Sequence, residues 1–294
     1  TKSFGADVVL HGDVYDDAYA KAVEIQKETG ATFLHPFNDK YVIAGQGTIG
    51  LEILEQLDGK VDTILCPIGG GGIIAGIAVA AKGINPNIKI VGVQTANIPS
   101  MQESMKNGEV TTAFKSTTIA DGIAVKTPGD VTFEIINELV DEVVVVEEDE
   151  IAQGMLFLME NQKVVAEGAG AVTTAALLSG KYVPKKDENV VCVISGGNVD
   201  VNTLYRVIGT ALTKEARRYS FNTVIQDKPG GLAELTKIIS EYDANILSAN
   251  LSRSSMGGAL GSLTAEMVLE TFNHDHIDKL KVAITEAGFE IVEI

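Results

Sequence analysis

Four consecutive glycines, Gly69–Gly72, are the part of the chain best suited to hold a charged ligand. They follow the apolar run Ile64–Ile68 and precede an Ala- and Ile-rich stretch, so the order strand, loop and helix is predicted. Without side chains, backbone N–H groups can converge on one anion at the positive end of a helix. A plain strand-to-helix turn is the alternative, but four glycines cost more chain entropy than such a turn requires. We therefore expect a phosphate site here.

Two segments match a dinucleotide-binding pattern in part. Gly45–Gly50 fits G-x-G-x-x-G, and the segment 70–75 fits G-x-G-x-x-A. A dinucleotide site also needs an acid at the end of the next strand, which binds the ribose. The next strands end at Cys66-Pro67 and at Val93-Gln94, and neither place offers Asp or Glu. The sequence therefore argues against NAD.

Two short polar segments follow further along the chain. Glu167 begins the segment 167–171. In one interpretation its carboxylate lies near a ligand or cation. In the other, the segment is a helix break whose small residues serve packing. Ser195 opens the segment 195–198 after a buried-looking strand. Its hydroxyl either caps a helix or faces the nitrogen of a heterocycle. A neutral hydroxyl would stabilise an unprotonated ring nitrogen.

Composition excludes several classes of partner. The 294 residues are 45% hydrophobic and 21% charged, and the net charge is -17. Such an acidic chain repels nucleic acid and anionic lipid, so we expect neither nucleic acid nor membrane as a partner. Cys66 and Cys192 lie in apolar runs and are predicted to be reduced core thiols, which suits a cytoplasmic protein.

The elements that position these groups alternate along the first part of the chain. Short apolar runs and longer helical patterns predict a mainly parallel sheet with helices on both faces, and ligands at the carboxyl ends of its strands. The expected strands are 8–10, 32–34, 63–67, 89–93, 143–146 and 190–194, and the expected helices include 16–29, 48–57, 73–82 and 148–161.

The pattern changes after residue 218. Strands are expected at 219–226, 245–253, 262–271 and 289–294, helices at 232–242 and 276–287, and a flexible loop at 254–258. This βαββαβ order is ferredoxin-like. We therefore expect two domains, 1–218 and 219–294.

Five motifs in this order resemble the threonine dehydratase (threonine ammonia-lyase) family. Its members use pyridoxal phosphate in fold type II, a mainly parallel α/β architecture like that of tryptophan synthase β. The resemblance covers residues 1 to about 215 and implies α,β-elimination from L-threonine, giving 2-oxobutanoate and ammonia. L-serine would be a second substrate, giving pyruvate. The motifs are Gly45–Glu52, Pro67–Gly72, Ala120–Val125, Glu167–Ala171 and Ser195–Asn198.

The resemblance also assigns roles to residues. Ser195 would bind the pyridine nitrogen, and Gly122 would lie near the ring. Glu167 and the Ala171 carbonyl look like the monovalent or divalent cation ligands of related serine racemases. Those relatives have an acid where this chain has Thr173, which argues against a divalent metal. The cofactor phosphate would be held by Gly69, Gly70, Gly71, Gly72 and Ile73.

Residues 219–294 resemble an ACT domain, a regulatory module that often binds amino acids. This implies an amino-acid or nucleotide effector. It also implies a homo-oligomer, dimer or tetramer, because ACT domains pair through exposed strands. The residues placed at an effector by this resemblance are Asp227, Gly230, Leu232 and Asn245. Shorter single-domain members of the dehydratase family respond to AMP, and Asn198 would be the contact for it.

One family motif does not occur in the sequence. The lysine that forms the Schiff base lies in a Ser-Phe-Lys-x-Arg-Gly-Ala segment, which in the family precedes the region matching Thr1. We therefore expect a catalytic domain without roughly its first hundred residues, and little activity from this chain alone. The alternatives are a non-catalytic amino-acid sensor and a β-replacing relative such as a cysteine synthase.

Overall fold

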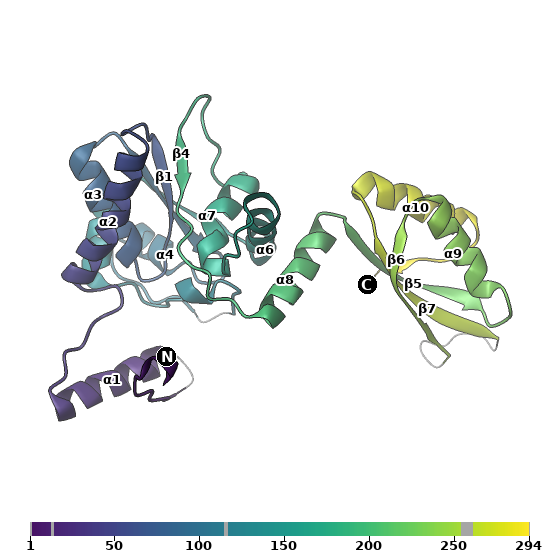
Figure 1. Ribbon diagram of the computed structural model, residues 1–294, viewed down its shortest axis with the longest axis horizontal. Helices are drawn as coiled ribbons and strands as arrows, with labels where there is room; N and C mark the ends of the chain where they lie inside the picture. The colour runs from purple at the N-terminus through teal and green to yellow at the C-terminus, as the bar shows by residue number, and fades with distance from the viewer. Residues whose placement is uncertain (1, 13–14, 115–116, 254–260, 294) are drawn as a thin grey trace.

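The parallel strands expected in the first two thirds of the chain form one sheet. The computed structural model describes residues 2–12, 15–114, 117–253 and 261–293. The sheet has the order β3-β2-β1-β4, and every neighbouring pair is parallel (Figure 1). Its strands are β1 (Thr63–Pro67), β2 (Lys89–Thr95), β3 (Glu142–Val146) and β4 (Val190–Cys192). The expected parallel α/β fold is confirmed, and β1 has the predicted bounds.

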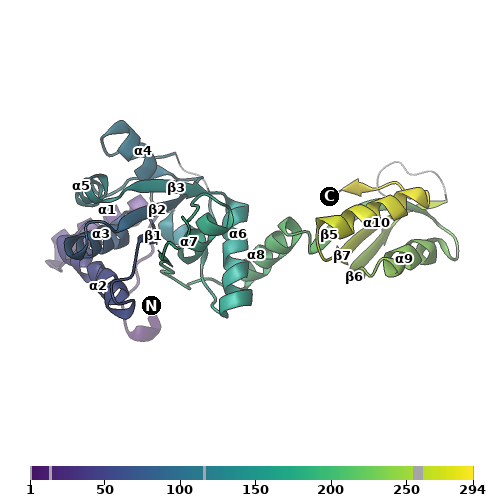
Figure 2. The same cartoon turned by 90° about the horizontal axis from the view of Figure 1, so that it is seen from above.

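Helices cover both faces of this sheet, as Figure 2 shows from above. Because successive side chains of a strand point to opposite faces, Ile64 and Cys66 pack with α2, α3 and α5, whereas Leu65 packs with α6, α7 and α8. The helices are α2 (Lys40–Gln56), α3 (Gly72–Ile84), α4 (Ser100–Asn107), α5 (Asp130–Leu139), α6 (Glu148–Phe157), α7 (Gly168–Leu178) and α8 (Val201–Lys214). Two short helical segments, η2 (Asp121–Ile123) and the π-helical η3 (Leu158–Gln162), complete this part.

The G-x-G-x-x-G segment lies inside helix α2, so the predicted start of this helix at residue 48 was wrong. The helix begins at Lys40, where the carboxylate of Asp39 accepts hydrogen bonds from two backbone amides of the first turn. The glycines serve packing, because a Cβ on Gly47 would lie 3.0 Å from the Gly76 carbonyl oxygen of α3. The glycines of this pattern therefore let α2 and α3 pack closely, and they do not form a dinucleotide-binding loop.

Two strands predicted near the amino terminus, 8–10 and 32–34, were wrong. Neither segment forms a helix or strand, and both lie outside the two sheets. Leu10 is 89% exposed and Leu34 is 75% exposed. A strand needs a neighbour for its N–H and C=O groups, and within the described residues no segment pairs with either. The predicted helix between them is present as α1 (Tyr15–Thr29), and a short η1 (Lys2–Phe4) precedes it.

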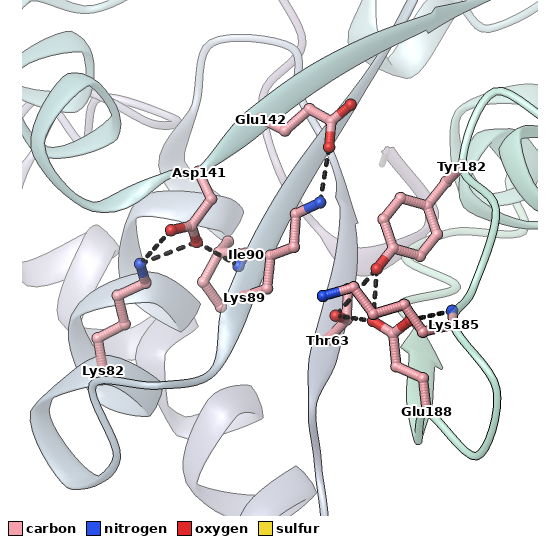
Figure 3. A network of polar contacts seen from close by, with 9 residues as sticks. All are labelled: Thr63, Lys82, Lys89, Ile90, Asp141, Glu142, Tyr182, Lys185 and Glu188. Carbon is pink, nitrogen blue, oxygen red and sulfur yellow. Dashed lines mark hydrogen bonds and ion pairs between the residues drawn. The ribbon is translucent and has the colours of Figure 1, made fainter.

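Polar contacts between side chains connect the strands at the amino-terminal edge of the parallel sheet (Figure 3). The Lys89 ammonium lies 2.7 Å from the carboxylate of Glu142, joining the starts of β2 and β3. The Glu188 carboxylate accepts hydrogen bonds from the hydroxyls of Thr63 and Tyr182, which joins the loop before β4 to the start of β1. These bonds lie at the edge opposite the predicted ligand site.

A second sheet follows α8, with the antiparallel order β6-β7-β5-β8 (Figure 1). Phe221 of the sheet and Leu235 and Leu280 of the helices are fully buried in one core. The elements are β5 (Arg218–Gln226), α9 (Gly231–Glu241), β6 (Asn245–Ser252), β7 (Ser262–Glu270), α10 (His274–Glu286) and β8 (Val292–Glu293). The βαββαβ order is confirmed, and the loop predicted at 254–258 lies outside the described residues.

None of the helices in the described ranges has the length and apolar character to cross a membrane.

Candidate functional site

Four segments far apart in sequence meet at the carboxyl edge of the parallel sheet. They line a cavity of about 270 Å³. The glycine loop 69–72 contributes one wall, and Gly122, Glu167 and Ser195 contribute others. Ligands of parallel α/β sheets bind at this edge, because the loops that follow the strands gather there. The structure therefore places these predicted site residues on the walls of one cavity.

The glycine loop presents unused backbone donors to this cavity. Gly71 is the N-cap of α3 and has φ +98°, a conformation that suits glycine. The hydroxyl of Thr132 donates to the Gly70 carbonyl oxygen over 2.6 Å and so fixes the loop from behind. The amides from Gly69 to Ile73 donate no hydrogen bond to any other described residue. Free amides at the start of a helix fit a bound phosphate.

Phe37 closes the loop from the other side and was not expected from the sequence. A Cβ on Gly70 would lie 2.3 Å from the Phe37 ring, so only glycine lets the ring approach this closely. The ring is held by a turn in which Nδ1 of His35 accepts the amide hydrogens of Phe37 and Asn38. Partial burial lowers the pKa of His35, which favours the neutral imidazole that this acceptor role requires. The turn residues lie in no motif that sequence reasoning could have singled out.

Glu167 is the N-cap of α7, and its carboxylate lies at the cavity. Its Oε2 accepts the amide hydrogen of Asn198 over 2.9 Å, and its own amide donates to the Gly196 carbonyl over 3.1 Å. A Cβ on Gly122 would lie 3.1 Å from Oε1 of the same carboxylate. Glu167 therefore joins the segment 195–198 to the segment around Gly122.

Ser195 is exposed on the cavity wall, and the helix-cap interpretation of its segment was wrong. Helix α8 begins only at Val201, and Asp200 caps it by accepting the amide hydrogen of Thr203 over 2.9 Å. The Ser195 hydroxyl makes no hydrogen bond with the other residues that the structure describes. It remains available to a ligand.

The two predicted cation ligands both belong to helix α7, with Glu167 at its N-cap and Ala171 inside it. Ala171 is fully buried in α7, and the hydroxyl of Thr173 donates to the Val193 carbonyl over 3.1 Å. Across the described ranges, no three His, Cys, Asp or Glu side chains form a group that could hold a metal. One oxygen of the Glu167 carboxylate accepts a protein amide hydrogen, that of Asn198.

Both cysteines are free thiols in the sheet that supports the site. Burial raises the pKa of Cys66 well above its usual range and raises the pKa of Cys192 to about 11. A thiol with such a pKa is not a nucleophile at neutral pH. The prediction of reduced core thiols is confirmed for Cys66, which is fully buried, while Cys192 is partly buried.

The residues predicted to contact an effector lie in two places. Asn198 does not line the cavity itself, but its backbone amide donates a hydrogen bond to the cavity residue Glu167. The other four lie in the second sheet unit: Asp227 pairs with Arg253, Gly230 caps α9 with φ +94°, Leu232 packs against the core, and Asn245 donates to Glu270. The structure does not bring Asn198 together with these four.

Comparisons with known proteins identify the family of this chain. Residues 1–196 match the family described as pyridoxal-phosphate dependent enzyme. An L-threonine ammonia-lyase of Thermotoga maritima is 48% identical over 99% of this chain and 72% of the relative. The catabolic L-threonine dehydratase TdcB of Escherichia coli is 50% identical over 71% of this chain and 64% of its own length.

A solved structure extends this likeness to three dimensions. The processed form of threonine deaminase isoform 2 from Solanum lycopersicum aligns with a TM-score of 0.66 and 37% identity. The alignment covers 71% of this chain and 61% of the tomato chain. On its motifs, its fold and these matches, the chain belongs to the family of pyridoxal-phosphate dependent enzymes.

Proposed function

We propose that residues 1–218 form the catalytic domain of a threonine ammonia-lyase that uses pyridoxal phosphate. The observation that carries this proposal is the set of free amides from Gly69 to Ile73, residues that line the same cavity as Ser195 and Gly122. The similarity to L-threonine ammonia-lyases supplies the choice of reaction. The products would be 2-oxobutanoate and ammonia, or pyruvate and ammonia from L-serine.

Each part of the cavity has a task in this proposal. The amides of the loop 69–73 hold the cofactor phosphate, and the Ser195 hydroxyl donates to the pyridine nitrogen. When bound, the cofactor withdraws electrons from the α-carbon of the amino acid. Phe37 and the buried Ile123 exclude water from the cavity walls. Because Ser195 is neutral, it favours an unprotonated ring nitrogen.

The proton transfers of the reaction need a group that these residues do not supply. No Ser-Phe-Lys-x-Arg-Gly-Ala segment occurs in the 294 residues. The thiol nearest to the loop, Cys66, is buried and its pKa is raised. We propose that these 294 residues alone bind cofactor without turning over threonine, because none of them lies in the family's lysine segment.

Two proteins test this proposal together. The first is the 294-residue chain, and the second is a fusion that carries the family's lysine segment and its surrounding domain ahead of Thr1. With pyridoxal phosphate and L-threonine, we expect 2-oxobutanoate and ammonia in equal amounts from the fusion and none from the shorter chain. Turnover by the shorter chain would refute the need for the lysine. Reaction of the fusion with O-acetylserine but not with threonine would favour the β-replacing alternative.

For residues 219–294 we propose an ACT domain with an amino-acid or nucleotide effector, in a cytoplasmic homo-oligomer. The βαββαβ order and the sheet order β6-β7-β5-β8 support this, as does the edge position of β6, which is open to pairing with a second copy. Calorimetric titration with isoleucine, valine and AMP tests the effector. Saturable binding of one of them is expected, and its loss in Asp227→Ala would place the site at the start of α9.

A further inference from the structure

The carboxylate of Glu167 is engaged by the backbone of the segment 195–198. One oxygen accepts the Asn198 amide hydrogen over 2.9 Å. The other lies against Gly196, where a Cβ would come within 2.1 Å of it. The backbone amide of Glu167 donates to the carbonyl of Gly196, so the segment is bonded to this one residue twice.

The surroundings of Glu167 offer compensation for its charge without a metal ion. Glu167 caps α7, and the positive end of a helix stabilises a carboxylate. A cation ligand would need partners, but two residues beyond Ala171 the chain has Thr173, whose hydroxyl donates to a carbonyl oxygen. Among the described residues no acidic, histidine or cysteine side chains gather there into a metal-holding group. These residues do not fit the cation site of the serine racemases.

We infer that Glu167 is a positioning residue that holds the segment 195–198 at the cavity through the Asn198 amide, without a bound cation. The inference deepens the proposed function and rests on it, because the segment carries the hydroxyl of Ser195 toward the ring nitrogen. Gly170 contributes to the same packing, since a Cβ there would lie 2.5 Å from the Gly196 carbonyl oxygen. Ser195 is thus held by its neighbours, while its own hydroxyl stays free for the ligand.

The first test uses the cofactor-free protein and measures amide hydrogen exchange at Asn198. In the original chain and in Glu167→Gln, which keeps an acceptor oxygen, we expect a protected amide. In Glu167→Ala the amide should exchange about tenfold faster or more, because the bond is lost. Addition of magnesium, potassium or a chelator should leave the original rate unchanged.

Three outcomes of this test would overturn the inference. The first is an unchanged Asn198 rate in Glu167→Ala. The second is a cation that alters the rate about tenfold, since it would then compete for or organise the carboxylate. The third is an equally faster exchange of the Asn198 amide in Glu167→Gln and in Glu167→Ala. Protection of the amide would then require the negative charge of Glu167, as a bound cation would.

The second test measures the affinity for pyridoxal phosphate, with Glu147 as the matched control. Glu147 also caps a helix, α6, and takes part in a capping box away from the cavity. Glu167→Ala should weaken binding about tenfold or more, whereas Glu147→Ala should lower stability without changing affinity. Equal affinities of the two variants would contradict the inference. If the original chain fails to bind the cofactor, the proposed function fails, while the exchange experiment still decides the role of Glu167.

Discussion

Gly71 is the residue of the glycine loop at which an added methyl group should lower the stability of the protein most. It has φ +98°, outside the range that residues with a side chain favour. A Cβ would lie 2.7 Å from Cδ1 of Ile136 and 2.9 Å from Cβ of Thr132, both on helix α5. Those atoms belong to buried side chains with little room to move. Gly71→Ala therefore perturbs both the backbone and the packing behind the loop.

The size of this effect follows from three contributions. The left-handed backbone costs a residue with a Cβ about 1–2 kcal/mol. Overpacking against Ile136 and Thr132 adds about 1–3 kcal/mol. The unfolded chain loses freedom when glycine becomes alanine, which offsets about 0.4–1 kcal/mol. We expect Gly71→Ala to lower the free energy of unfolding by about 1–4.5 kcal/mol.

Urea unfolding of the cofactor-free protein measures this loss, and the same helix supplies the control. Gly83 lies near the other end of α3, and no atom lies within 4 Å of a Cβ placed there. Gly83→Ala should stabilise the protein by about 0.5–1 kcal/mol, because alanine is the better helix former. Gly71→Ala should also weaken pyridoxal phosphate binding, while Gly83→Ala should not. A loss below about 0.5 kcal/mol in Gly71→Ala would refute the reasoning.

Two further predictions concern the contacts that hold the first unit together. Hydrogen bonds from Thr63, Tyr182 and the Lys185 amide lower the pKa of Glu188 from 4.5 to about 2. Since the folded state favours the charged form, its stabilisation is present above pH 4.5 and is lost as pH falls toward about 2. Glu188→Gln should cost about 1–2 kcal/mol near neutral pH and less at about pH 3 in chemical unfolding, and a constant difference would contradict this. Arg217 pairs with Glu160 and Glu215, and its side chain is 37% exposed. A double-mutant cycle of Arg217→Ala with Glu160→Ala should give a coupling of about 1 kcal/mol or less, and a clearly larger value would contradict a solvent-screened pair.

Local patterns in the sequence predicted the centre of the first sheet. The apolar run Ile64–Ile68 predicted β1, and the four glycines after it predicted the loop at the cavity. Both features depend on residues that are neighbours in the chain. Backbone conformation and burial of a short apolar run follow from such local information.

Long-range packing explains what the sequence did not predict. The glycines of α2 resemble a loop until α3 is placed against them, because only the Gly47–Gly76 approach shows why they are needed. Phe37 closes the glycine loop from a turn with no motif of its own. The bond between Glu167 and the Asn198 amide joins positions 31 residues apart. Strand-like runs such as 8–10 stay out of the sheets because pairing, and not hydrophobicity alone, makes a strand.

The central claim is that the free amides of residues 69–73 hold the phosphate of the cofactor. Equilibrium dialysis of the 294-residue chain against pyridoxal phosphate and against pyridoxal, which lacks the phosphate, tests it most directly. We predict that one molecule of pyridoxal phosphate binds about 100-fold more tightly than pyridoxal and is displaced by inorganic phosphate. Equal affinities for the two compounds would contradict the assignment of this loop.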